Sequence, residues 1–296
     1  MASTSATEPI ISDGDLIALW LDGLSANTQD AYRRDIKLLL DEFLDGYPIQ
    51  ELKVADLYAY KSWMGSQGYK PATVRRKLAA VKSLLSFAAR LQYVPSNVGA
   101  VLTTPKLAST LAGRILTQSE VFRLFALEDD PRKLIFLKTI YYTGARVSEV
   151  CSLLWRSFDV RDGGLVQVNI IGKGNKPRSV VVPKAVWSEL FALRETAIAN
   201  VGETAIANIP VFPGRDPSTP MNRRTAHSIV KAAAKRAGIN PNVSCHWLRH
   251  AHAQHALSQG APLELVRDTL GHASISTTNQ YLESNPTDSS SNYLQT

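Results

Sequence analysis

Four short segments in the second half of the chain hold residue types that could break and remake a phosphodiester bond. The segments are residues 143–149, 172–178, 246–250 and 270–281. No single segment is specific, but together they supply two arginines, a lysine in a glycine-rich turn, two histidines and a tyrosine. The candidate catalytic residues are Arg146, Lys173, His246, Arg249, His272 and Tyr281.

These residue types suit attack on a phosphate without a metal ion. Arginine donates paired hydrogen bonds to non-bridging oxygens and stays charged at any working pH. A tyrosine hydroxyl can attack the phosphorus and hold the phosphate covalently, which conserves the bond for rejoining. The departing 5′ oxygen needs a proton, which a lysine on a hairpin could supply. His246 and Arg249 are three residues apart, so one face of a helix presents both.

Metal-dependent chemistry fits the sequence less well. Two-metal phosphoryl transfer needs oxygen ligands from several acids, and the four segments hold no cluster of carboxylates. The histidines at 246, 250, 252 and 255 could suggest zinc. However, the first three point in different directions on a helix, and no cysteine or acid completes a ligand set. We therefore expect no metal site and no cofactor.

In this order and spacing, the four segments resemble those of the tyrosine recombinase family, which includes lambda-integrase and Xer-type enzymes. The resemblance covers the C-terminal part of the chain closely and the helical N-terminal part in outline. It implies a mainly α fold with a small antiparallel β-sheet. A helical, SAM-like core-binding domain and a mixed α/β catalytic domain would together clamp double-stranded DNA.

The resemblance also implies a role for each positively charged candidate. Arg146 and Arg249 would clamp the scissile phosphate. Lys173, the first lysine of the hairpin turn, would be the general acid toward the leaving oxygen. Lys176 is its rival for that role, and its alternative role is contact with the DNA backbone.

The remaining candidates receive roles from the same resemblance. His246 would assist proton transfer with the tyrosine, and His272 would hydrogen-bond a non-bridging oxygen. Tyr281 would become a 3′-phosphotyrosine, with Tyr293 as a second tyrosine beyond the motif. Glu149 matches an acidic position that supports the active site, and its alternative is an acid on a helix surface.

A few positions depart from the family pattern or indicate packing. His252 stands where Phe is usual and Gln254 where Thr is usual, and neither position carries chemistry. His250 and His255 match structural positions of the motif. After Tyr281, a proline and several serines disfavour the longer helix by which Xer-type enzymes commonly dock into a neighbouring subunit.

The implied activity is site-specific recombination without ATP or metal. Four subunits would join two DNA sites and exchange strands in pairs, with accessory recombination proteins as further partners. One alternative is a type IB topoisomerase, which shares the chemistry but relaxes supercoils as a monomer; the small helical N-terminal domain favours recombination. A second alternative is a non-catalytic DNA-binding relative, against which the complete set of site residues argues.

Hydrophobic periodicity places the four segments in the second of two domains. Residues 1–11 are expected to form a disordered tail. Apolar residues at helical spacing predict about four helices in residues 12–102. Residues 103–116, rich in Thr, Ser, Ala and Pro, indicate a linker. The catalytic domain is then predicted to span residues 117–296.

Local signals support that second domain. Thr117 and Glu120 form a capping box that begins its first helix. Residues 165–171 and 178–182 are rich in β-branched side chains and predict the two strands of a hairpin. The turn between these strands carries Lys173.

The charge distribution indicates a nucleic-acid partner. The net charge is +7, but residues 1–45 carry only three Lys and Arg against nine Asp and Glu. Residues 46–105 carry eight against two, and residues 106–296 carry 22 against 15. An acidic start therefore masks a basic remainder, as expected for a chain that faces phosphates.

Two helical faces and the hairpin supply candidate DNA contacts. For the helices the alternative is a charged face exposed to solvent. Acids are absent from the first face, and none occurs between Asp216 and Glu264. The candidate DNA-binding residues are Arg75, Arg76, Lys82, Arg90, Lys176, Arg178, Arg224, Lys231 and Lys235.

Bulk properties indicate where the protein works. The chain is 45% hydrophobic and 20% charged, and no apolar run approaches the length of a membrane span. The polar N-terminus does not resemble a secretory signal. Two cysteines, Cys151 and Cys245, make no disulfide framework and favour a reducing compartment. We expect a bacterial cytoplasmic protein associated with the nucleoid and not with a membrane.

The nucleophile gives the first prediction. Tyr281→Phe should keep DNA binding but form no covalent adduct with a nicked suicide substrate, because the variant lacks the attacking hydroxyl. Denaturing gel electrophoresis of protein bound to labelled DNA measures the adduct. An adduct that survives the change, or that maps to Tyr293, would contradict the assignment.

Overall fold

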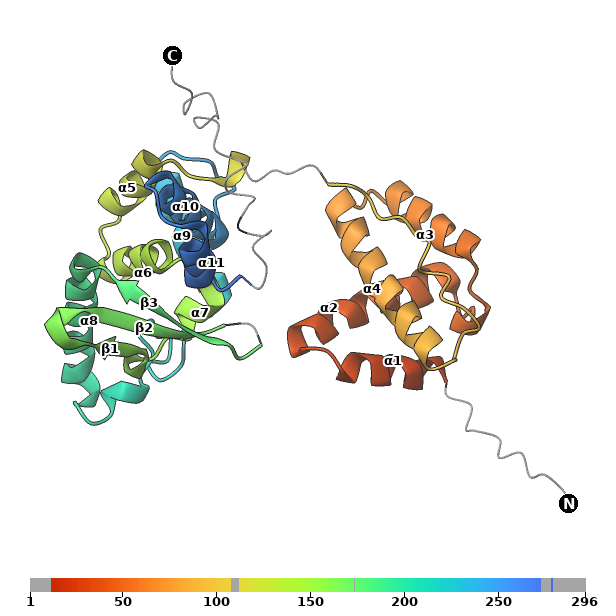
Figure 1. The fold of residues 1–296 in the computed structure, drawn as a ribbon, viewed down its shortest axis with the longest axis horizontal. Helices are drawn as coiled ribbons and strands as arrows, with labels where there is room; N and C mark the ends of the chain where they lie inside the picture. The colour runs from red at the N-terminus through yellow and green to blue at the C-terminus, as the bar shows by residue number, and fades with distance from the viewer. Residues whose placement is uncertain (1–11, 108–111, 173, 273–277, 279–296) are drawn as a thin grey trace, which may run out of the picture. The chain divides into compact units, whose positions relative to one another are not determined.

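In the computed structural model the chain divides into two compact units, each with its own hydrophobic core (Figure 1). The structure describes residues 12–107, 112–172, 174–272 and 278. The first unit is Met1–Ala108 and the second is Ser109–Thr296. The division falls within residues 103–116, the stretch that the sequence indicates as a linker.

The regular secondary structure of the N-terminal unit is all helical among its described residues, as predicted. Its elements are α1 (Asp13–Asp22), α2 (Ala26–Lys37), the π-helix η1 (Leu38–Leu44), the short 3₁₀ helix η2 (Ile49–Glu51), α3 (Val54–Ser66) and α4 (Pro71–Arg90). Ser12 caps α1 in a reciprocal capping box with Asp15. Pro71 occupies the first turn of α4, where a missing N–H costs no hydrogen bond.

A buried carboxylate joins two helices of this unit. Asp35 of α2 is almost inaccessible to solvent and pairs with Arg76 and with Lys77, whose Nζ lies 3.1 Å away. Removing either partner of such a pair would leave an uncompensated buried charge, so the pairing fixes α2 against α4. Lys82 of α4 donates to the carbonyls of Ala100 and Leu102 at 3.3 and 2.7 Å, which holds the chain that leaves the helix.

The C-terminal unit packs helices around a small sheet. Its α-helices are α5 (Gln118–Ala126), α6 (Pro131–Thr143), α7 (Val147–Cys151), α8 (Lys184–Val201), α9 (Arg223–Arg236), α10 (Cys245–Ser258) and α11 (Leu263–Leu270). Its 3₁₀ helices are η3 (Ala112–Arg114), η4 (Trp155–Ser157), η5 (Asp162–Gly164) and η6 (Ile206–Asn208). The capping box of Thr117 and Glu120 begins α5, as the sequence indicates.

Three antiparallel strands form the sheet, in the order β1 (Phe158–Val160), β2 (Val166–Ile171) and β3 (Pro177–Val182). Strands β2 and β3 are the predicted hairpin. β1 is an addition to the prediction, because three residues are too few to show an alternating pattern. The mainly α fold with a small antiparallel sheet is confirmed.

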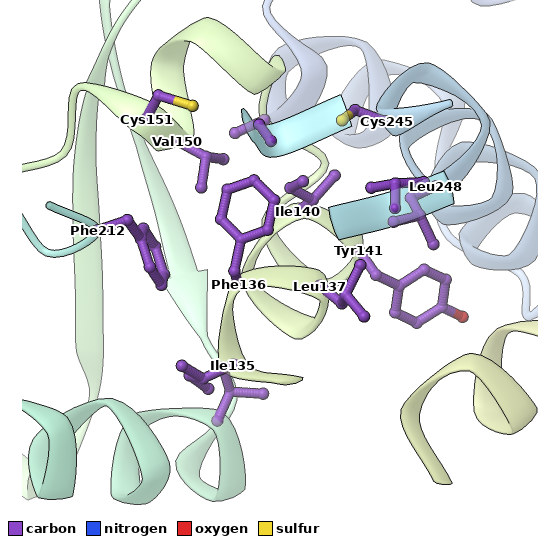
Figure 2. Close-up of a cluster of buried hydrophobic side chains, with 14 of the residues drawn as sticks. Ile135, Phe136, Leu137, Ile140, Tyr141, Val150, Cys151, Phe212, Cys245 and Leu248 are labelled. Atoms are coloured by element: carbon purple, nitrogen blue, oxygen red, sulfur yellow. The ribbon is translucent and has the colours of Figure 1, made fainter. Parts of the chain in front are cut away.

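Helix α6 runs through the middle of the C-terminal core. Figure 2 shows its Phe136 and Ile140 among side chains of α7 and α10 and beside Phe212. The aromatic rings of Phe136 and Phe212 pack edge to face, with their centroids 5.2 Å apart. Both cysteines are buried and free. Among the described residues no helix is long and apolar enough to cross a bilayer.

Candidate active site

Arg146 lies in the tight turn between α6 and α7. Helix α6 ends at Thr143 and is capped by Gly144, whose φ of 59° is a left-handed conformation that favours glycine. A Cβ on Gly144 would lie 2.7 Å from Cδ2 of His252, so the close approach of α10 also requires glycine there. The turn places Arg146 at the N-cap of α7.

Glu149 of α7 is a buried carboxylate held by two arginines. One oxygen accepts from Nη1 of Arg146 at 3.0 Å and Nη1 of Arg178 at 3.2 Å. The other accepts from the backbone N–H of Arg146 at 2.8 Å and Nη2 of Arg178 at 2.6 Å. Burial alone would raise the pKa of Glu149, but the hydrogen bonds from Arg178 and Arg146 outweigh it and lower the pKa. The carboxylate is therefore ionised, and the surface role considered for it does not match its burial.

Three arginines meet at the C-terminal end of α11. Arg178 donates from Nε to the carbonyl of Thr269 at 2.8 Å, and Arg249 donates from Nη2 to that of Leu270 at 2.7 Å. Arg146 donates from Nη2 to the carbonyl of Gly271 at 3.4 Å. These consecutive carbonyls at a helix end carry partial negative charge, which the guanidinium groups complement.

Arg249 of α10 is the most deeply buried of these arginines, with 2% of its surface exposed. Its Nη1 donates to the carbonyl of Gly144 at 2.6 Å. The same guanidinium therefore joins the ends of α6 and α11. Arg249 is held in place from two sides by main-chain atoms.

The candidate histidines lie beside these arginines. The rings of His246 and His250 are perpendicular, and their centroids are 5.2 Å apart. His272 follows α11 directly, and its Nδ1 lies 2.9 Å from Oγ1 of Thr278, a hydrogen-bond distance. Burial, followed by the charge of Arg249, lowers the pKa of His246 and lowers the pKa of His272 to about 4. Both rings are therefore neutral at pH 7 and can accept or donate a proton.

Two of the predicted catalytic residues, Lys173 and Tyr281, lie outside the described residues. The ends of the turn around Lys173 are described, and the N–H of Gly172 donates to the carbonyl of Lys176 at 2.9 Å. Lys176 is exposed at this turn. Arg178, grouped with it from the sequence as a DNA contact, points inward instead and binds Glu149.

The other candidate DNA contacts differ in their surroundings. On α9, Arg224, Lys231 and Lys235 are exposed. On α4, Arg75 and Arg90 are exposed, and the guanidinium of Arg90 lies over the ring of Phe87. Arg76 and Lys82 of α4 have the intramolecular partners described above. Among the described residues no group of three His, Cys, Asp or Glu side chains could hold a metal ion.

Comparison with known families decides the class of protein. Residues 114–288 match the phage integrase family, and residues 16–92 match the N-terminal SAM-like domain of phage integrases. The chain belongs to the phage integrase family. This confirms the predicted resemblance to tyrosine recombinases.

Individual relatives of this phage integrase family member agree with that assignment. The tyrosine recombinase XerD of Vibrio cholerae serotype O1 is 32% identical over 93% of each chain. The Tn1549 transposon integrase in complex with circular intermediate DNA has a TM-score of 0.71 at 17% identity, covering 95% of this chain and 98% of that one. XerH bound to difH substrate in a pre-cleavage complex has a TM-score of 0.63 at 21% identity, covering 86% and 73%. The predicted enzyme, a tyrosine-type site-specific DNA recombinase, is thereby confirmed.

The neutral histidines of this recombinase make its stability depend on pH. Burial, the first cause, lowers the pKa of His252 to about 4, while an unfolded histidine titrates near 6.5. The unfolded state therefore binds more protons as the pH falls from 6.5 to 4, and stability is lost across that window. His252→Phe removes this titrating group. Between pH 7 and 4.5 the free energy of unfolding should therefore fall by about 2 kcal/mol less in the variant than in the parent.

Urea unfolding at both pH values measures this difference. Gln254→Thr is the matched control, because it changes a buried residue on the same helix without removing a titrating group. Its acid-induced loss of stability should equal that of the parent. An equal loss in His252→Phe would show that His252 is not held neutral by the fold.

Proposed function

We propose that this chain cuts and rejoins two duplex DNA sites through a covalent 3′-phosphotyrosine on Tyr281, without metal or ATP. The observation that carries the proposal is the meeting of Arg146, from the N-cap of α7, and Arg249, from α10, beside neutral His246 and His272. Among the similar structures, the Tn1549 integrase is in complex with circular intermediate DNA and XerH is bound to difH substrate.

The phosphate would be bound by the two arginines. Each guanidinium already contacts the end of α11, so the two side chains face a common point. Charge that grows on the non-bridging oxygens in the transition state would be met by donors already in place. His272 would add a hydrogen bond to one of these oxygens.

The covalent step exchanges one phosphoester for another. The oxygen of Tyr281 forms a bond to phosphorus while the bond from phosphorus to the 5′ oxygen breaks. The phenolic proton passes to His246, which is neutral and able to accept it. Lys173 gives a proton to the leaving 5′ oxygen. Attack by a 5′ hydroxyl from the partner duplex reverses these transfers and frees the tyrosine.

DNA would lie against both units of the chain. The exposed cations of α9 and α4, together with Lys176 on the hairpin turn, would contact phosphates. Such contacts on both units would clamp the duplex. Arg76 and Lys82 already have intramolecular partners, so their side chains would contribute less to phosphate binding.

The proposed number of subunits follows from the number of DNA strands that must be cut. Two duplexes have four strands to cut, and each subunit brings one Tyr281, so four subunits would complete the exchange on two sites. Accessory recombination proteins would choose the direction of exchange. The substrate places the enzyme at the nucleoid in the bacterial cytoplasm.

Exchange between two sites tests this function. Covalent adducts trapped on host DNA would be sequenced to give the cleavage site. A plasmid with two direct copies of that site should be resolved into two circles, and a plasmid with one copy should not. A type IB topoisomerase would instead relax either plasmid without exchange, and a non-catalytic relative would give neither product.

The chemistry of the leaving group distinguishes the proposed role of Lys173 from that of Lys176. Sulfur in place of the bridging 5′ oxygen departs without a proton, so it removes the need for a general acid. Lys173→Ala should cleave ordinary DNA roughly 100-fold or more slowly and recover most of its rate on the 5′-thio substrate. Lys176→Ala should show the same modest defect on both substrates.

Arg146→Ala is the control for this experiment. It should not be rescued by sulfur, because the charge on the non-bridging oxygens is present with either leaving group. Selective rescue of Lys176→Ala would move the acid role to Lys176 and leave the recombinase function standing.

A further inference from the structure

The guanidinium of Arg178 is occupied on all three nitrogens. Nε donates to the carbonyl of Thr269, and Nη1 and Nη2 form a two-pronged pair with the two oxygens of Glu149. The side chain is 11% exposed. A phosphate contact needs donors that face solvent, so this arrangement disfavours the DNA-binding role suggested by the charge of Arg178.

The same guanidinium fits between two glycines from distant parts of the chain. A Cβ on Gly172 would lie 3.2 Å from Nη1 of Arg178, and a Cβ on Gly271 would lie 3.2 Å from Nη1 and Cδ. Both contacts are tighter than ordinary packing. Arg178 thus touches the start of the hairpin turn and the end of α11 at the same time.

Each segment that Arg178 touches leads directly to a proposed catalytic residue. Gly172 precedes Lys173, and Gly271 precedes His272. Glu149 binds both the backbone and the side chain of Arg146. Three parts of the reaction machinery therefore have one neighbour in common.

We propose that Arg178 is a positioning residue of the recombination site, which sets the places of Arg146, His272 and the start of the hairpin turn at Gly172 relative to one another through Glu149 and the end of α11. The inference rests on the proposed function, because that function gives Arg146, His272 and the residue after Gly172 their roles. Arg178 itself does not touch the DNA.

The geometry of a guanidinium is essential to this role. A planar fork can hold both carboxylate oxygens and still reach a carbonyl with Nε. A lysine ammonium keeps the charge but is a single point, so it cannot reproduce all three contacts. Without Arg178, the carboxylate of Glu149 is balanced by Arg146 alone, which draws that guanidinium away from the phosphate.

The test separates DNA affinity from the rate of cleavage. Arg178→Lys and Arg178→Gln are compared with the parent on a nicked suicide substrate, at saturating protein and in a single turnover. We expect the cleavage rate to fall at least 30-fold in both variants. The dissociation constant should stay within about twofold, with the same dependence on salt.

The salt dependence distinguishes positioning from phosphate contact. Loss of one phosphate contact would reduce the slope of log affinity against log salt by about 0.9, and Lys176→Gln should show that loss. If Arg178→Gln shows it too, or if Arg178→Lys cleaves at the parental rate, the positioning role is wrong.

A matched control is available close to the same sheet. Arg161 follows β1 and pairs with Asp159 at 2.8 Å, but its side chain is exposed. Arg161→Lys and Arg161→Gln should leave both the rate and the affinity unchanged. That outcome would show that losing one arginine near the sheet is not enough to slow the reaction.

A double variant tests whether Arg178 acts through Glu149. If it does, Glu149→Gln combined with Arg178→Gln should cleave no more slowly than the worse single variant. Independent effects would multiply and contradict the proposal. Thermal unfolding of each variant verifies folding, and if Arg178→Gln does not fold, Arg178→Lys carries the comparison. A parent protein that forms no adduct would instead overturn the proposed function itself.

Discussion

The arrangement of the site depends on an imbalance of buried charge. Arg146, Arg178 and Arg249 converge on one helix end, and in the part of the chain that the structure describes Glu149 supplies a full negative charge to two of them. Main-chain carbonyls complete the coordination of these arginines, but a carbonyl carries only a partial charge. The surplus positive charge would attract the phosphate diester of the proposed reaction to hydrogen-bond donors that are already in place.

The same surplus adds to the effect of burial on the neighbouring histidines. Burial makes an imidazolium unfavourable, and nearby charge adds to this effect, first from His246 at His250 and first from Arg249 at His272. The pKa of both rings is lowered to about 4. Neutral rings suit a reaction in which a phenol must lose its proton close to an anion. In the proposed reaction the arginines would thus favour neutral partners for proton transfer as well as bind the phosphate.

The sequence predicted the helical and hairpin elements and the candidate segments because each has a local signal, such as the capping box before α5. It does not predict which groups a basic side chain contacts in the folded protein. Lys82 binds carbonyls of a later segment whose path has no local signature. Arg178 was recoverable, because strand periodicity puts it on the same face as the buried Val180 and Val182. The positive charge of Arg178 fits contact with DNA equally well, and that interpretation obscures the strand pattern.

The attachment of α11 has a mechanical consequence. Its last three carbonyl positions, residues 269–271, are tied to β3, α10 and the start of α7 by separate hydrogen bonds. Bonds arranged in parallel share a load, so a pull on the chain at His272 is divided among three elements of the core. No single bond has to bear the pull alone. A pull at His272 therefore reaches Arg146, Arg178 and Arg249 together, and no one of these side chains is displaced alone.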